Sequence, residues 1–74
     1  MGYSIHMRHE LERQVQLRTG RRIRDLAVEL WPERVVLHGR APSYYAKQLA
    51  QHGVRDLMPN VRLVNDIVVE DRVN

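Results

Sequence analysis

The sequence contains no cysteine and no long run of apolar residues, and each absence narrows what the protein can be. Without cysteine there is no disulfide, no thiolate metal site and no cysteine nucleophile. No stretch approaches the roughly 20 apolar residues that a membrane-spanning helix needs. Residues 1–8 lack the apolar run of a signal peptide. The default expectation is a cytoplasmic protein, and a peripheral-membrane or periplasmic location stays open if the chain is processed or excised from a longer one.

Sequence motifs for catalysis are missing as well. There is no Gly-x-Ser-x-Gly elbow and no phosphate-binding loop of the Walker or dinucleotide type. Asp66, Glu70 and Asp71 lie on a strand and its tail, which makes them a poor acid–base pair. His6 and His9 stand three residues apart, but a metal site needs three or four ligands on well-fixed elements. We therefore expect no enzyme activity, no metal and no cofactor.

The length and composition indicate one small folded domain. A chain of 74 residues buries only about 60% of the surface that its unfolded form exposes, which leaves no room for a deep cleft. Apolar residues make up 43% and charged residues 28%, values typical of a folded soluble domain. We predict a flexible N-terminus over residues 1–6, a single domain over residues 7–70 and a C-terminal tail over residues 71–74.

Hydrophobic periodicity predicts the first three elements. Apolar residues at every fourth position predict a helix over residues 7–19, which Gly20 ends as the C′ residue. Alternating apolar and polar residues predict strands over residues 23–30 and 35–40. The segment 31–34 contains a proline and predicts the turn between them.

The second half of the chain predicts one more helix and one more strand. Ser43 is a suitable N-cap for a helix over residues 43–57. Gly39, just before it, permits a bulge or a close neighbouring backbone. Asn65 interrupts the buried face of a strand over residues 61–69. Because a buried amide must be hydrogen-bonded, we predict that Asn65 bonds backbone near a bulge or a helix end and fixes the strand register.

Small residues mark one face of the second helix. Ala46, Ala50 and Gly53 recur at helical spacing and predict a close approach of this helix to the sheet. Glycine costs about 1 kcal/mol relative to alanine inside a helix, so Gly53 must have a packing reason.

The element order α-β-β-α-β predicts the fold. The two middle strands form an antiparallel hairpin, and the last strand lies parallel to the strand before the second helix. We predict an α+β fold, a two-layer sandwich in which two helices cover one face of a three-stranded mixed sheet.

Two segments resemble the signatures of the BON domain family. Residues 35–43 comprise an apolar strand, a glycine and a Pro-Ser pair that opens a helix. Residues 59–69 lead from a short turn into a valine strand with Val-Asn-Asp-Ile at its centre. Residues 11–15 and 26–30 resemble the first helix and first strand of the family. The likeness covers about residues 11–69.

The resemblance implies the α-β-β-α-β fold and a non-catalytic role. BON domains are similar to one another in attaching to phospholipid surfaces or protein partners, often in bacterial envelopes. The chain departs from the family at the turn 31–34, where BON domains usually have Asp-Gly or Asn-Gly. It also has Asn60 in place of a glycine, and Arg18 in a region that is usually apolar.

The basic residues gather in the N-terminal third. The chain has a net charge of +3, and all but one of its 12 basic residues are arginine, which suits bidentate contact with phosphate. The candidate anion-binding residues lie on the first helix and at the start of the first strand: Arg13, Arg18, Arg21, Arg22 and Arg24. The candidate interfacial aromatics are Trp31, Tyr44 and Tyr45. Our favoured interpretation of Trp31 is a cover for one end of the core.

These patterns leave several functions open. The leading hypothesis is a binding module that docks on an anionic phospholipid surface or a protein partner through its basic N-terminal region. The same arginines are compatible with non-specific nucleic-acid binding, although KH and RRM motifs are missing. A structural or oligomerising module is the third hypothesis, since Val36, Val64 and Val68 form an apolar row on the open sheet face. The plainest alternative is a solvated basic surface that maintains solubility.

Overall fold

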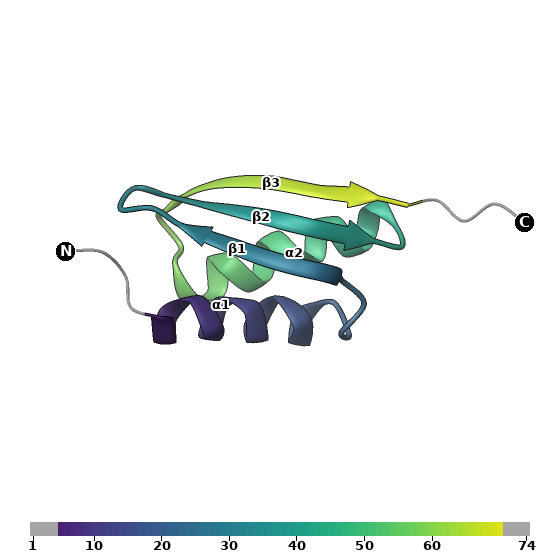
Figure 1. Cartoon of the computed structure of the whole chain (residues 1–74), viewed down its shortest axis with the longest axis horizontal. Coiled ribbons are helices and arrows are strands. Elements are labelled where there is room, and N and C mark those ends of the chain that lie inside the picture. Colours follow the sequence, from purple (N-terminus) through teal and green to yellow (C-terminus); the bar gives the residue numbers. More distant parts are fainter. Residues whose placement is uncertain (1–4, 71–74) are drawn as a thin grey trace, which may run out of the picture.

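The computed structural model describes residues 5–70, which fold as an α+β two-layer sandwich (Figure 1). The elements, in chain order, are α1 (Ile5–Arg18), β1 (Arg24–Leu30), β2 (Arg34–Ala41), α2 (Tyr44–Leu57) and β3 (Arg62–Val69). This order, and the mixed three-stranded sheet, confirm the fold predicted from the sequence. Neither helix in the described range is long and apolar enough to cross a bilayer.

The start of α1 corrects one predicted boundary. The helix begins at Ile5, so Ile5 and His6 belong to α1 and not to a flexible terminus. The apolar stripe did not include Ile5 and His6, because it marks only residues that face the core and the Ile5 side chain is exposed. The rest of the predicted N-terminus, residues 1–4, and the predicted tail, residues 71–74, lie outside the described residues.

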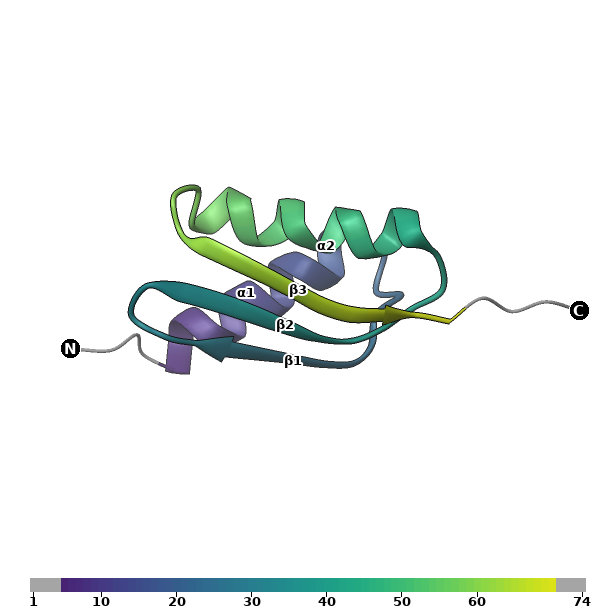
Figure 2. The same cartoon turned by 90° about the horizontal axis from the view of Figure 1, so that it is seen from above.

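The sheet has β2 at its centre, with β1 and β3 as its edges. β1 runs antiparallel to β2, and mutual backbone hydrogen bonds between Trp31 and Arg34 close the hairpin. β3 runs parallel to β2, so that Leu37 lies beside Asn65. Both helices pack against one face of this sheet and leave the other face uncovered (Figures 1 and 2).

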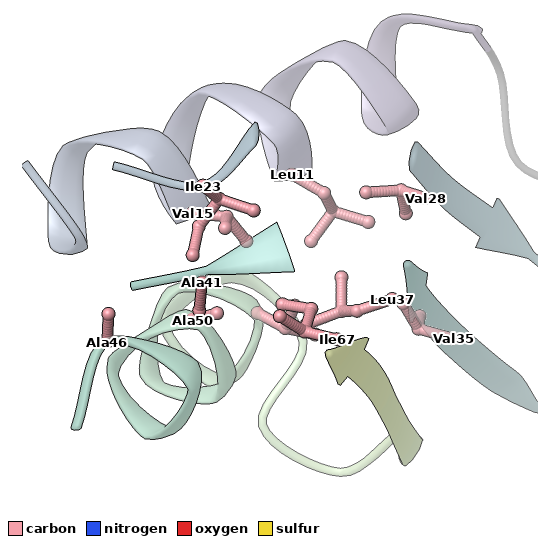
Figure 3. Close-up of a cluster of buried hydrophobic side chains, with 11 residues drawn as sticks. Leu11, Val15, Ile23, Val28, Val35, Leu37, Ala41, Ala46, Ala50 and Ile67 are labelled. Carbon is pink, nitrogen blue, oxygen red and sulfur yellow. The ribbon is translucent and has the colours of Figure 1, made fainter. Parts of the chain in front are cut away.

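The core lies between the helices and the sheet, where the predicted stripes meet (Figure 3). Every element contributes at least one buried apolar side chain, so no element is stable without the others. The core comprises Leu11, Val15, Ile23, Val28, Val35, Leu37, Ala41, Ala46, Ala50, Val54 and Ile67.

Gly53 packs closely against a neighbouring element, as its position inside a helix predicted. That element is α1 and not the sheet. A Cβ atom at Gly53 would lie 2.9 Å from the Cα of Val15 and 3.0 Å from the carbonyl oxygen of Gln14. The two helix backbones therefore touch at this point. Small residues at helical spacing indicate that something comes close, but they do not indicate which element it is.

The structure confirms the local roles predicted for Ser43, Gly20 and Gly39. The Ser43 hydroxyl accepts a hydrogen bond from the Ala46 amide at 3.1 Å and caps α2. Gly20 has a φ of +66° and ends α1 in a Schellman motif, in which the Arg21 amide donates to the Gln16 carbonyl at 2.6 Å. Gly39 has a φ of +151°, and a Cβ atom there would lie 3.0 Å from the Arg24 carbonyl oxygen.

Asn65 ties β3 to α2. Its Nδ2 donates to the Lys47 carbonyl at 2.8 Å and to Gln51 Oε1 at 3.2 Å, while its Oδ1 accepts from the Ile67 amide at 3.1 Å. The prediction of a backbone-bonding amide is confirmed, with the backbone of α2 as the partner. Because the bonds reach from a strand to a helix, they hold β3 in one register beneath α2.

Candidate anion-binding site

Four arginines meet at one end of the molecule. Arg21, Arg22, Arg24 and Arg40 line a hollow of about 330 Å³, together with Ala41, Pro42 and Glu70. We call this region the basic end. It lies where the α1–β1 loop, the end of β2 and the end of β3 come together (Figure 2).

The sheet topology creates this meeting point. Because β1 is antiparallel to β2, the first residue of β1 pairs with the end of β2, and Arg24 lies opposite Arg40. Because β3 is parallel to β2, its last residues reach the same end, which brings Glu70 alongside. Sequence reasoning missed Arg40, which lies sixteen positions after Arg24. Counting back from the hairpin turn would pair Arg24 with Ala41, and a register shift near the start of β1 brings Arg40 opposite Arg24 instead.

Two of the four guanidinium groups are held in place. Arg22 Nε donates to the Thr19 carbonyl at 2.9 Å. Arg40 lies between two carboxylates, with Nε 3.5 Å from Asp25 Oδ2 and Nη1 3.7 Å from Glu70 Oε2. These contacts orient both side chains at the rim of the hollow and neutralise part of the charge of Arg40.

The other two guanidinium groups face solvent. Arg21 and Arg24 are exposed, and their side chains form no hydrogen bond or ion pair with any residue between 5 and 70. Their backbone is unusual: Arg21 has a φ of +58°, and Asp25, after Arg24, has a φ of +54°. Left-handed conformations are rare for residues other than glycine, so this short loop is held in its shape by the surrounding packing.

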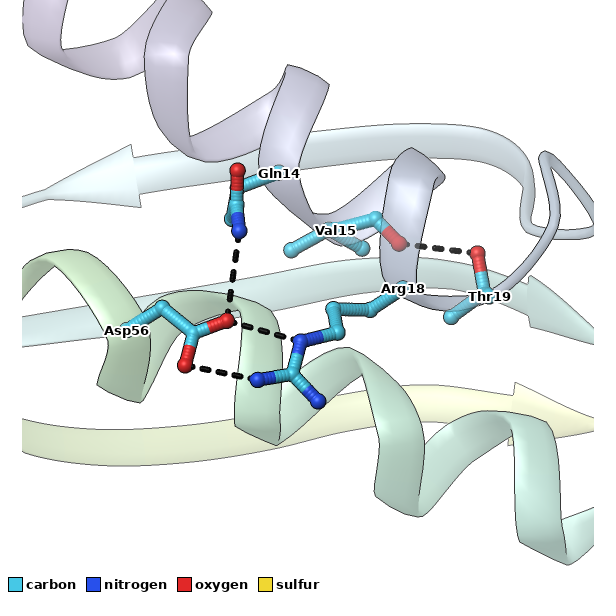
Figure 4. A network of polar contacts seen from close by, with 5 residues as sticks. All are labelled: Gln14, Val15, Arg18, Thr19 and Asp56. Atoms are coloured by element: carbon cyan, nitrogen blue, oxygen red, sulfur yellow. Dashed lines mark hydrogen bonds and ion pairs between the residues drawn. The ribbon is translucent and has the colours of Figure 1, made fainter.

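Arg18, a predicted anion-binding residue, has a structural partner instead. Its Nε and Nη2 donate to Asp56 Oδ2 and Oδ1 at 2.7 and 2.8 Å, and Gln14 donates to the same carboxylate at 3.2 Å (Figure 4). The hydrogen bonds from Arg18 and Gln14 hold the pKa of Asp56 below its ordinary value. The same bond, with the charge of Asp56, raises the pKa of Arg18. This pair joins α1 to α2, so Arg18 does not belong to the basic end.

Arg13 also lies apart from the basic end. Its Nη1 is 3.7 Å from Glu10 Oε1, an exposed pair within α1. Arg13 lines a second hollow, of about 470 Å³, between α1 and β1. That hollow mixes both signs of charge, because Glu12 and Asp25 line it along with Arg13 and Arg21. Of the five predicted arginines, the structure therefore brings together Arg21, Arg22 and Arg24.

The candidate aromatic residues separate into two groups. Tyr44 and Tyr45 are 63% and 65% exposed in the first turn of α2, two and three positions after Pro42 in the wall of the hollow. Trp31 lies in the β1–β2 hairpin at the opposite end of the sheet (Figure 1). Only the tyrosines therefore accompany the arginines.

Trp31 is not a cover for the core, so that interpretation is wrong. Trp31 is 45% exposed and is not one of the residues that form the core cluster. Instead, its indole N–H donates to Glu29 at 3.1 Å, and the Arg34 guanidinium lies 5.0 Å from the ring centroid. Glu29 alternates with the buried Val28 and so projects from the open face, which draws the indole to that side.

The open sheet face carries a polar network and not a continuous apolar row. Val36 is only 8% exposed, and it lies beside Val64, whereas the exposed Val68 lies beside Arg40. His38 Nε2 is 2.6 Å from Glu29 Oε2 on the same face. Hydrogen bonds from the Trp31 indole and from His38 lower the pKa of Glu29.

Within residues 5–70, no three histidine or carboxylate side chains come together as a metal-binding group. The chain matches no protein-family model, and no curated protein or solved structure matches it. The resemblance to BON domains stays a prediction that rests on the two sequence segments described above. Function is therefore inferred from the geometry of the basic end.

Proposed function

We propose that this protein is a non-catalytic binding module that docks reversibly on anionic phospholipid surfaces through its basic end. The observation that carries the proposal is the convergence of Arg21, Arg22, Arg24 and Arg40 on one hollow. Three of these residues come from a single loop and the start of β1, and the fourth comes from the end of β2.

The charge at the basic end is sufficient for weak, reversible docking. Each arginine near an anionic bilayer contributes about 1 kcal/mol, and Arg40 contributes less because Asp25 and Glu70 already lie beside it. Arg21, Arg22 and Arg24 together then supply about 3 kcal/mol, which gives attachment that salt weakens.

The tyrosines at the start of α2 favour a bilayer over other anionic partners. Tyr44 and Tyr45 are exposed at the same end as the hollow, and tyrosine is enriched at the level of lipid headgroups. A nucleic-acid strand instead requires a basic groove that follows successive phosphates. Here the charge is concentrated in one hollow at the end of the sheet.

Vesicle sedimentation tests the proposal directly. The wild-type chain is expected to sediment with phosphatidylglycerol vesicles and not with phosphatidylcholine vesicles, and to be released at about 1 M salt, where charges are screened beyond about 3 Å. The triple variant Arg21→Gln, Arg22→Gln, Arg24→Gln is expected to lose this binding.

A charge-matched control variant separates the basic end from general polycation behaviour. Arg8→Gln, Arg13→Gln, Arg62→Gln removes the same number of charges from exposed positions elsewhere. It is expected to retain most of the binding. Equal losses in both triple variants, or equal and negligible binding of the wild type to both kinds of vesicle, would overturn the proposal. Binding to single-stranded DNA that persists at physiological salt would favour the nucleic-acid alternative.

A further inference from the structure

We propose that the hollow at the basic end is a discrete site for a phosphomonoester, a group with three terminal phosphate oxygens on one phosphorus atom. This inference deepens the proposed function and rests on it. It differs from docking by diffuse charge, because a discrete site distinguishes between anionic lipids that give a membrane the same surface charge.

The size of the hollow suits one small anionic group. Ligand sites for small molecules have volumes of about 300–1,000 Å³, and the hollow of about 330 Å³ lies at the lower end of that range. Ala41 and Pro42 form an apolar wall beside the arginines. A wall that excludes water lowers the local dielectric constant and strengthens each interaction between a guanidinium and a phosphate.

The number of guanidinium groups matches a phosphomonoester better than a diester. A guanidinium presents a planar fork of donors that can bind two phosphate oxygens at once. A phosphomonoester carries a charge of about −1.5 to −2 and three terminal oxygens near neutral pH. A phosphodiester, the group in phosphatidylglycerol, has a single charge and two terminal oxygens. Arginines on several sides of one hollow are therefore better satisfied by the monoester.

Two of the arginines are positioned before a ligand arrives. Arg22 is tethered to the Thr19 carbonyl at 2.9 Å, and Thr19 is itself fully buried, with its hydroxyl donating to the Val15 carbonyl at 2.8 Å (Figure 4). Arg40 is held between Asp25 and Glu70. Side chains that are already ordered lose less conformational entropy on binding, so they favour a site of defined geometry.

The backbone around the arginines is held tightly as well. Gly39 lets the start of β1 approach β2 so closely that a Cβ atom there would lie 2.9 Å from Ile23 Cγ2. Arg21, before Ile23, has a φ of +58°, a strained conformation for a residue with a side chain. Such conformations persist only where the surroundings enforce them, and they cluster at ligand sites.

Glu70 provides the sharpest test, because it competes with the ligand. Among residues 5–70 it is the one acidic residue in the wall of the hollow, and its Oε2 lies 3.7 Å from Arg40 Nη1. Glu70→Gln removes the competing charge and keeps the shape of the side chain, while Asp25 still holds Arg40. We expect this variant to bind the phosphomonoester several-fold more tightly than the wild type.

The experiment compares two anionic lipids in vesicles of equal surface potential. Phosphatidic acid presents a phosphomonoester, and phosphatidylglycerol presents a diester. We expect the full chain to bind phosphatidic acid vesicles about tenfold more tightly, the effect of about one additional charge-assisted hydrogen bond. Arg21→Gly is expected to abolish this preference; it removes the guanidinium at a position where glycine suits the left-handed backbone, so folding is preserved.

The outcomes separate this inference from the proposed function. Equal affinity for the two lipids, with no gain from Glu70→Gln, would overturn the inference and leave the proposed function intact. Binding to neither lipid would overturn both. Glycerol 3-phosphate, a soluble phosphomonoester, distinguishes the source of the group. Displacement from phosphatidic acid vesicles only at high millimolar concentration supports a lipid headgroup as the ligand, whereas micromolar binding would support the hollow but overturn bilayer docking.

Discussion

The two ends of the sheet use their arginines in opposite ways. At the hairpin end, Arg34 stacks over Trp31, and Arg55 Nη1 donates to the Val61 carbonyl at 2.5 Å. At the basic end, the side chains of Arg21 and Arg24 have no hydrogen-bond or ion-pair partner within residues 5–70. A charged side chain that bonds its own fold contributes to stability, whereas one that lines a hollow without such a bond is available to a ligand. This difference is why function is assigned to one end and not to the other.

The largest expected effect comes from breaking the contact that builds the basic end. Gly39→Ala would place a methyl group 2.9 Å from Ile23 Cγ2, at a φ of +151° that a side chain rarely adopts. We expect the free energy of unfolding to fall by about 3 kcal/mol, from overpacking and backbone strain together. Urea unfolding followed by circular dichroism measures it.

Gly20→Ala serves as the matched control for this substitution. Gly20 also has a positive φ, of +66°, but a Cβ atom there would meet nothing closer than 3.6 Å. Gly20→Ala should therefore lower the free energy of unfolding by only about 1 kcal/mol, the cost of a left-handed backbone for a residue with a side chain. If the two variants lose equal stability, then the close approach at Gly39 does not hold the basic end together.

A pair of single substitutions sharpens the comparison between the ends. Arg55→Gln removes the hydrogen bond to the Val61 carbonyl and should lower the free energy of unfolding by about 1 kcal/mol, with no change in vesicle binding. Arg24→Gln should do the reverse, weakening vesicle binding while changing stability by less than about 0.5 kcal/mol. Chemical denaturation and vesicle sedimentation on the same two variants check this crossed pattern. A common effect of both variants on both measurements would show that the two ends do not differ.

The smallest expected effect concerns pH and the pair between Arg18 and Asp56. Because the pKa of folded Asp56 lies below its ordinary value, the carboxylate stabilises the fold fully at pH values above that ordinary value. The contribution is lost as the pH falls through the lowered pKa. The pKa of Glu29 is also lowered, so its contribution to the stability of the fold is likewise lost as the pH falls.

Asp56→Asn removes one of these two contributions. The variant should have a lower Tm than the wild type at about pH 7, and the difference should shrink as the pH falls to about 2, below the ordinary carboxyl range. Thermal unfolding across this range measures it. A difference in Tm that stays constant with pH would mean that the carboxylate charge is not what joins the helices.

Residues with local roles were predictable from the sequence. Gly20 ends α1 and Ser43 caps α2 because each bonds backbone within a few positions of itself. Asn65 was predicted as a backbone-bonding amide because it stands alone on an apolar face, although its partner in α2 lies 18 positions away. In each case the residue type and its neighbours in the chain carried enough information to state the role.

Residues whose roles depend on distant partners were not predictable in the same way. Arg18 was predicted to bind anions together with Arg21 and Arg22, but it bonds Asp56, 38 positions later in the chain. Arg40 was missed because only strand pairing places it opposite Arg24. Trp31 was interpreted as a cover for one end of the core, and its indole N–H instead donates to Glu29 on the open face.

The sequence alone determined the order of the helices and strands. It also determined which face of each element is apolar and forms the core, since periodicity follows directly from the geometry of helices and strands. It also determined that most of the charge in the first third is positive. The tertiary structure alone decided which arginines are available and where they meet. Carboxylates and carbonyl groups from distant parts of the chain pair with some arginines and leave others without a partner among the described residues. The hollow of the basic end exists only once β1, β2 and β3 are paired in register.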